Sequence, residues 1–172
     1  ALYHGVTQYV SEEMNRADRL AAEGEGRRAN QVGFALTSLQ RRLASSPEAI
    51  CQSLRRRRER LEKRLREEKL QKRGEEAAIE AEADELPDLS DDALDDLEDA
   101  PEEEIYAIEE QVMDRATAAR TVRELELEID ALKRLETEAH KVWRSGTDCK
   151  WEQLSSILQN DEEMFDAHGH RR

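Results

Sequence analysis

The fold is decided by residues 45–70, which read SSPEAICQSLRRRRERLEKRLREEKL. Proline at the first position of a helix loses no hydrogen bond, because that backbone position has no partner within the helix. Ser46 can cap the helix from the preceding position, and Glu48 lies where the helix dipole is positive. A single glycine, Gly74, interrupts the stretch that follows. The sequence therefore predicts a long helix over residues 47–85.

This predicted helix carries a narrow apolar stripe, and so does a second long helix predicted over residues 105–145. In both segments apolar residues recur at steps of three or four. Glu136 interrupts the second stripe, and its register slips on the N-terminal side of Val122. A helix cannot bury such a stripe alone, so we expect an antiparallel helical hairpin that resembles a coiled coil. The stripe residues include Ile50, Leu54, Leu61 and Leu65 in the first helix and Leu125, Ile129, Leu132 and Ala139 in the second.

Shorter amphipathic helices are predicted over residues 2–20 and 28–44, and a last one after Ser145 and Gly146. We expect them to pack at the base of the hairpin, because most of the large aromatic residues lie in or beside these segments. The fold class is therefore all-α. The predicted division of the chain is a helical base over 1–46, a first hairpin helix with a basic stem over 47–85, an acidic tip over 86–104, a second hairpin helix over 105–145 and a helical segment over 146–172.

Composition agrees with long helices and excludes several other folds. Charged residues form 40% of the 172 residues, whereas an ordinary globular domain has about 25%. With only 4% aromatic residues, the chain is too polar for a thick core, and seven Gly and three Pro are too few for a β-sandwich or barrel. The net charge of −14 is unusual for a dedicated nucleic-acid-binding protein, although part of the surface can still be basic.

Acidic residues are concentrated between residues 75 and 104, where sixteen Asp and Glu occur without any Lys or Arg. Such a block repels itself, so we expect a loop at the tip of the hairpin, with one short turn capped by Ser90. The aspartates of this block lack the glycine and the terminal glutamate of a calcium-binding EF-hand loop. No metal site is therefore predicted here.

Basic residues are concentrated in residues 55–73, where eleven Lys and Arg and four acids give a net charge of +7. One interpretation is that they pair across the hairpin with Glu124, Glu126, Glu128 and neighbouring acids. The other is contact with nucleic-acid phosphates, which would be independent of sequence and sensitive to salt. No aromatic residue lies in the run, so base stacking is not indicated. The candidate phosphate-binding residues are Arg41, Arg42, Arg55, Arg56, Arg57, Arg58, Arg60, Lys63 and Arg64.

Motifs for catalysis, cofactors and membranes are absent from the sequence. It contains no phosphate-binding P-loop, no dinucleotide fingerprint and no His-Glu-x-x-His metal motif. Cys51 and Cys149 are 98 residues apart and are expected to be unpaired thiols in the reducing cytoplasm. No apolar run approaches the roughly 18 residues of a membrane span. We therefore predict no catalytic residue, metal ligand or cofactor site, and no membrane partner.

Residues 2–16, 32–37 (VGFALT) and 39–50 (LQRRLASSPEAI) resemble the segment that follows the first RecA-like lobe in bacterial Swi/Snf-type helicases related to RapA, including helicases of the phage-defence kind. Asp148, Lys150, Trp151 and Leu154 look like the helix that opens the second lobe of these enzymes. The resemblance covers residues 1–66 and 146–160, and only weakly the acidic middle of the chain.

The resemblance implies that the chain is a fragment of a longer protein, namely a non-catalytic helical insertion between two lobes of a DNA-dependent ATPase. ATP and magnesium would then belong to the parent enzyme, an ATP hydrolase, and not to this segment. The expected partners are the flanking RecA-like lobes and DNA, and self-association through the hairpin remains an alternative. A different interpretation is a coiled-coil scaffold whose acidic tip binds a basic partner.

Overall fold

The structure, a computed structural model, describes residues 1–71, 85–146 and 154–158. The first two ranges contain α1 (Leu2–Ala22), α2 (Gly26–Ser45), α3 (Pro47–Gln71), α4 (Asp91–Glu98), α5 (Glu102–Arg115) and α6 (Val122–Ser145). Residues 154–158 are also helical. The structure assigns no strand within the described ranges, so the prediction of an all-α fold is confirmed.

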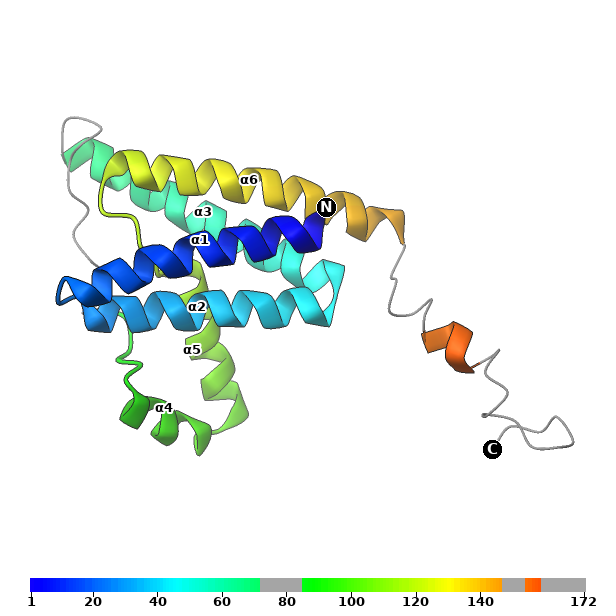
Figure 1. Cartoon of the computed structure of the whole chain (residues 1–172), viewed down its shortest axis with the longest axis horizontal. Helices are drawn as coiled ribbons and strands as arrows, with labels where there is room; N and C mark the ends of the chain where they lie inside the picture. Colours follow the sequence, from blue (N-terminus) through cyan, green and yellow to red (C-terminus); the bar gives the residue numbers. More distant parts are fainter. Residues whose placement is uncertain (72–84, 147–153, 159–172) are drawn as a thin grey trace, which may run out of the picture.

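Four of the helices form an antiparallel bundle (Figure 1). α1 packs against α2, α2 against α3, α3 against α6 and α6 against α1. Neighbouring helices around the bundle run in opposite directions. α5 crosses the bundle and contacts both α2 and α3, while α4 lies at the periphery (Figure 1). This arrangement gives every long helix two neighbours on which to bury its apolar stripe.

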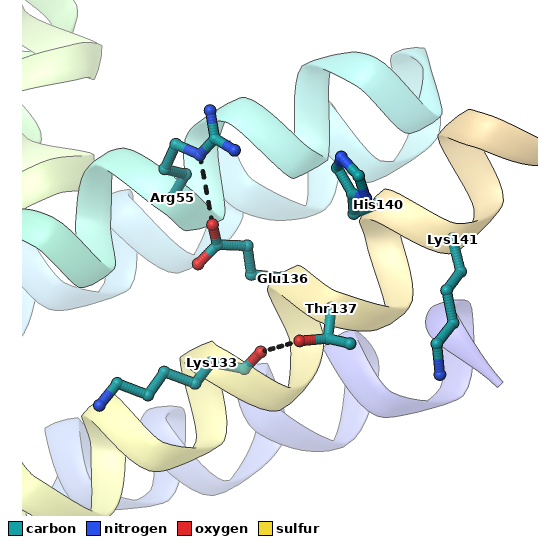
Figure 2. A pocket seen from close by; sticks show the side chains of 6 residues that line it. All are labelled: Arg55, Lys133, Glu136, Thr137, His140 and Lys141. Carbon is teal, nitrogen blue, oxygen red and sulfur yellow. Dashed lines mark hydrogen bonds and ion pairs between the residues drawn. The ribbon is translucent and has the colours of Figure 1, made fainter.

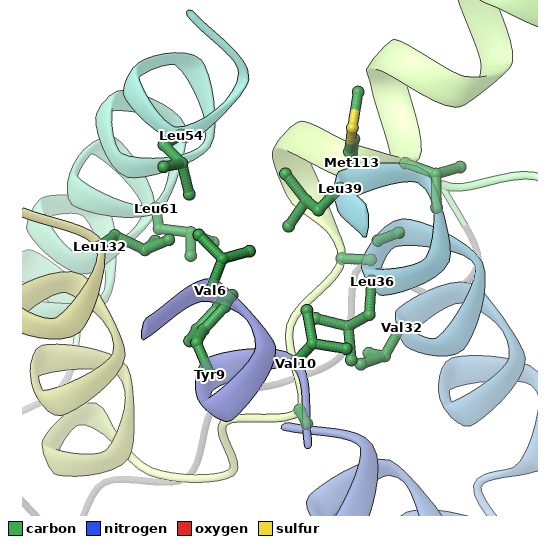
Figure 3. Packing of buried hydrophobic residues seen from close by; sticks show 14 of the residues in the cluster. Val6, Tyr9, Val10, Val32, Leu36, Leu39, Leu54, Leu61, Met113 and Leu132 are labelled. Carbon is green, nitrogen blue, oxygen red and sulfur yellow. The ribbon is translucent and has the colours of Figure 1, made fainter. Parts of the chain in front are cut away.

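The core forms where the apolar stripes of these helices meet (Figure 3). Val6 and Tyr9 of α1 face Leu54 and Leu61 of α3, while Val10 turns toward α2. Most of the stripe residues predicted from the spacing are buried. Of the stripe residues named above, Ile50, Leu54, Leu61, Leu125, Ile129, Leu132 and Ala139 are buried, and Leu65 is partly buried against them.

Local signals at the helix ends also act as predicted. The hydroxyl of Ser46 accepts a hydrogen bond of 3.0 Å from the amide of Ala49, which caps α3 directly before Pro47. Gly146 ends α6 in the left-handed conformation with φ 65°, and its amide donates to the carbonyl of Trp143. A glycine adopts that conformation without the steric cost of a side chain.

The helix predicted over 105–145 is two helices, because the chain breaks at residues 116–121 between α5 and α6. The guanidinium of the buried Arg28 donates to the carbonyls of Thr117 and Ala119 and so holds the chain in the turn. The hydroxyl of Thr121 then accepts from the amide of Glu124 at 3.2 Å and starts α6. Neither proline nor glycine marks this break, and the slip in register was its visible sign.

The expected base of short helices at one end of a hairpin is also wrong. α3 and α6 are antiparallel, as ion pairs Arg55–Glu136, Glu62–Lys133 and Lys69–Glu126 show. They are nevertheless two sides of a bundle, since α1 and α2 lie along them (Figure 1). α1 and α2 have 21 and 20 residues, nearly the length of α3, and alignment along the bundle buries more of their apolar faces than packing at one end.

The acidic segment over 86–104 is not a distal tip. Leu86 and Leu89 are buried, and the side-chain amide of Gln31 donates to the carbonyls of Leu86 and Pro87. These contacts hold the segment against α2, because Leu86 and Leu89 have apolar side chains that are buried there. The predicted short turn appears as α4, and Ser90 precedes it, but the hydroxyl of Ser90 makes no capping hydrogen bond to the helix. Residues 72–84 of the predicted first hairpin helix and most of the last predicted helix lie outside the described residues.

Candidate functional site

A buried network of polar side chains joins four helices at the centre of the bundle. Its central residue is Arg57 of α3, which is completely buried. Its Nε donates to the hydroxyl of Tyr9 at 2.9 Å, one terminal nitrogen donates to the carbonyl of Met113 at 2.7 Å, and the other donates to Glu128 at 2.7 Å. Arg57 thereby connects α3 to α1, α5 and α6.

The carboxylate of Glu128 is equally well satisfied. It accepts a hydrogen bond of 2.7 Å from the hydroxyl of Tyr9 and another from the hydroxyl of Thr117. Burial raises the pKa of Tyr9 well above its ordinary value, so this residue remains a neutral donor. Burial alone would lower the pKa of Arg57, but its contacts with Tyr9 and Glu128 raise it above the ordinary value. The network therefore holds one positive and one negative charge in contact.

Glu13 adds a second carboxyl group to this region from α1. The residue is 4% exposed, and its Oε2 atom has no hydrogen-bond partner among the described residues. Its other oxygen lies 3.5 Å from the guanidinium of Arg16. Burial, followed by the charge of Glu128, raises the pKa of Glu13 to about 7. Glu13 is thus protonated in a large fraction of molecules at neutral pH.

The sequence could have located this network by position, although it was not predicted. Arg57 falls on the apolar stripe between Leu54 and Leu61, three and four residues away from them. By the same spacing, Glu128 lies between Leu125 and Leu132, and Glu13 lies between Val10 and Ala17. A charged residue at such a position is buried with its helix face and needs a partner on a neighbouring helix.

Most of the candidate phosphate-binding residues are engaged with acids. Arg55 and Arg58 both contact Glu136, which explains the acid that interrupts the stripe of α6. Arg56 lies 3.3 Å from Glu110 and 3.5 Å from Asp114. Of the three acids named in the pairing prediction, Glu126 pairs with Lys69 and Glu128 with Arg57, whereas Glu124 accepts from the backbone amide of Arg120.

The remaining candidates divide into three groups. Arg41 and Arg42 both reach Glu109 of α5, and Arg64 pairs with Glu68 one turn along α3. Arg57 cannot touch a phosphate, because none of its surface is exposed, so its assignment was wrong. Arg60 and Lys63 have no ion pair among the described residues, and Arg66 shares their face of α3 at steps of three.

A hollow with several basic side chains lies between α3 and α6 (Figure 2). It is lined by Arg55, Lys133, Glu136, Thr137, His140 and Lys141. Its cations do not converge: Arg55 turns to Glu136, while Lys133 and Lys141 extend away from each other. Each lysine also has its own acid, at 3.3 Å from Glu62 and Glu138 respectively. The arrangement is typical of a solvated surface and not of an anion site.

The described residues contain neither a metal-binding cluster nor a membrane-spanning helix. No cluster of three or more His, Cys, Asp or Glu side chains within the described ranges is arranged to hold a metal ion. Among the helices described, none has the length and apolar character to cross a membrane. No protein family, curated protein or solved structure matches the chain.

Proposed function

We propose that this chain is a non-catalytic helical module of an ATP-dependent DNA helicase or translocase, inserted between its two motor lobes and coupling their movements. The similarity of residues 2–50 to the segment after the first lobe of Swi/Snf-type enzymes motivates this proposal. ATP and magnesium would bind to the lobes, and this chain would supply no catalytic group.

The observation that carries the proposal is the position of the bundle's two ends. Ala1 lies beside α6, where it lines a hollow together with Arg134 and Glu138. α6 ends only a short distance further on, at Ser145, on the same side of the molecule (Figure 1). A module whose ends are close together can be inserted into another domain without separating the parts that it joins.

The buried network supports a mechanical role as well. Arg57 is bonded to α1, α5 and α6 at once, so relative sliding of these helices would break the hydrogen bonds of a buried charge. A bundle held in this way moves as one body, and a displacement at one lobe would be transmitted to the other.

DNA contact by this module would rest on Arg60, Lys63 and Arg66. These side chains lie on the outer face of α3, and none has an ion pair with another described residue. The other arginines would have to break their ion pairs before they could bind a phosphate. Those pairs join Arg55 and Arg58 to Glu136, and Arg56 to Glu110 and Asp114. The expected contact is to the backbone of DNA and weakens as salt rises.

The test is DNA binding and DNA-stimulated ATP hydrolysis in the intact motor protein. Arg60, Lys63 and Arg66 are changed together to Gln, and the control changes the exposed Arg19, Arg123 and Arg134 to Gln. We expect the salt-sensitive affinity for DNA and the stimulation of ATP hydrolysis by DNA to fall about tenfold in the first variant. Both should change little in the control. Equal behaviour of both variants would remove DNA contact from the proposal. An intact protein without DNA-stimulated ATPase activity would overturn the motor assignment itself.

A further inference from the structure

The segment from residue 87 to residue 108 forms a hollow with an apolar floor and an acidic rim. α4 and α5 enclose it on the side of the molecule away from α1 and α6 (Figure 1). Its volume is about 200 Å³. The apolar lining includes Leu89, Ala93, Leu97 and Ile108, and the acidic lining consists of Asp88, Asp96 and Glu104.

The helix that forms one wall of this hollow is poorly covered by the rest of the molecule. α4 has eight residues, and none of them is buried. Leu94 and Leu97 are only half-buried, although both contact the core. A helix of this length is unstable in water without tertiary contacts. The accessible parts of its apolar side chains are therefore available to a partner that would stabilise it.

The charge around the hollow has one sign. Residues 85–104 include eleven Asp and Glu and no Lys, Arg or His. Among the described residues, the ion pair formed by these acids joins Glu85 to Arg115 at 2.7 Å. The acids that line the hollow are consequently not neutralised by the described part of the chain, and they favour a positively charged ligand.

We propose that this hollow binds a basic amphipathic helix of a partner protein. An apolar side chain of that helix would occupy the floor between Leu97 and Ile108, and its Lys or Arg side chains would lie against Asp96 and Glu104. Recognition of an amphipathic helix by an apolar groove with complementary charge needs both features together. DNA does not fit this site, because its phosphates carry the same charge as the rim. The inference does not depend on the motor function proposed above.

The probe for this site is a fluorescent synthetic peptide of about 14 residues that places leucine on one helical face and lysine on the other. Its binding to the complete chain is measured by fluorescence anisotropy at low and high salt. Two control peptides replace either all leucines by serine or all lysines by glutamate. We expect the amphipathic basic peptide to bind, the serine peptide to bind at least about tenfold more weakly, and the glutamate peptide not to bind.

Two double variants separate a defined site from general attraction to an acidic protein. Asp96→Asn with Glu104→Gln removes two charges from the rim, whereas Asp95→Asn with Glu103→Gln removes two exposed charges that do not line the hollow. All four residues are exposed, so circular dichroism should show unchanged helix content. We expect the rim variant to weaken peptide binding about five- to tenfold and the matched variant less than about twofold.

Any one of the following results would overturn the proposal. The first is absence of binding by the amphipathic peptide, and the second is equal weakening by both double variants or equal binding of the serine peptide. The third is a dimer in sedimentation equilibrium that the rim variant dissociates and that the peptide cannot displace, because the hollow would then be occupied by a second copy of the chain. Leu97→Ser tests the floor separately, and unchanged peptide affinity in this variant would also contradict the proposal.

Discussion

Arg57 shows how much depends on a single side chain in this molecule. Removing two ions from water is costly, and their attraction compensates for it only when every remaining donor and acceptor is bonded. Arg57 and Glu128 are both fully buried, and Tyr9, Thr117 and a backbone carbonyl supply further hydrogen bonds to the pair. The pair therefore matters less as a source of stability than as a condition for the correct alignment of the helices.

Replacement of Arg57 by Leu is expected to lower the free energy of unfolding by about 3–5 kcal/mol, because it leaves the charge of Glu128 buried without a partner. The Arg57→Lys variant should have an intermediate free energy of unfolding, since an ammonium group cannot reproduce the three hydrogen-bond directions of the guanidinium. Urea denaturation measures both. The double variant Arg57→Leu with Glu128→Leu should recover much of the loss, and a double variant as unstable as the sum of both single variants would contradict a coupled pair.

Glu13 is expected to make stability fall as pH rises. Its pKa is about 7 in the folded chain and 4.5 in its ordinary state, so the folded chain holds the proton more tightly. Below pH 4.5 the carboxyl is neutral in both states, and between pH 4.5 and 7 the unfolded chain releases its proton first. The stability that Glu13 contributes is therefore complete below pH 4.5 and is lost as pH rises toward 7, by at most about 3 kcal/mol.

The variant Glu13→Gln removes this titration and should be more stable than the natural chain at pH 8 but not at pH 4. The groups that act on Glu13 are Tyr9, Arg16, Arg57, Glu128 and the neighbouring Glu12. The pKa of Glu136 is shifted in the opposite direction. Burial alone would raise this pKa, but hydrogen bonds from Arg58 and Arg55 lower it, so the stability that Glu136 contributes is lost as the pH falls. Thermal unfolding of both chains over this pH range isolates Glu13 as the difference between them. A constant difference would refute the assignment.

At the scale of elements, the break between α5 and α6 is the feature that changes the fold most. A continuous helix over 105–145 would carry residues 102–115 along the axis of α6 and away from α2. The turn instead sends α5 across α2 and α3, and it brings Met113 to the network (Figure 1). Arg28 fixes this turn from α2 by bonding two carbonyls that the break leaves outside any helix.

Arg28→Ala should therefore destabilise the chain by about 1–3 kcal/mol, because buried carbonyls lose their donors. Hydrogen exchange should accelerate first in residues 116–121 and at the end of α5. The neighbouring Arg27 is a matched control, since it is exposed and donates a single bond, of 3.0 Å, to the carbonyl of Leu86. Arg27→Ala should cost less than about 1 kcal/mol. Equal losses in the two variants would contradict a special role for Arg28.

At the scale of the whole molecule, the sequence predicted the helices more reliably than their arrangement. Helix ends depend on local signals such as Ser46, Thr121 and Gly146, and the apolar spacing predicts which face is buried. The choice between a hairpin and a bundle depends on which faces meet over long distances, and spacing alone does not contain that information. The same limit applied to Arg57, whose partners lie 48 and 71 residues away in the sequence.

Stability should be uneven across the molecule. α1, α2, α3 and α6 share one core and one polar network, so we expect them to unfold together. α4 buries none of its residues and is expected to open far more easily. Hydrogen exchange followed by mass spectrometry should show α4 exchanging well before the centres of α3 and α6. Equal protection would mean that α4 belongs to the cooperative unit.

Cys51 gives access to the opening of this core in solution. Cys51 lies on α3 and is 2% exposed, and burial raises the pKa of its thiol, so a thiol reagent cannot attack it while the bundle is closed. In a chain where Cys149 is replaced by Ser, the rate of thiol labelling would report how often α3 separates from its neighbours. The labelling rate of Cys51 thus reports how tightly α3 is held by its neighbours in the bundle.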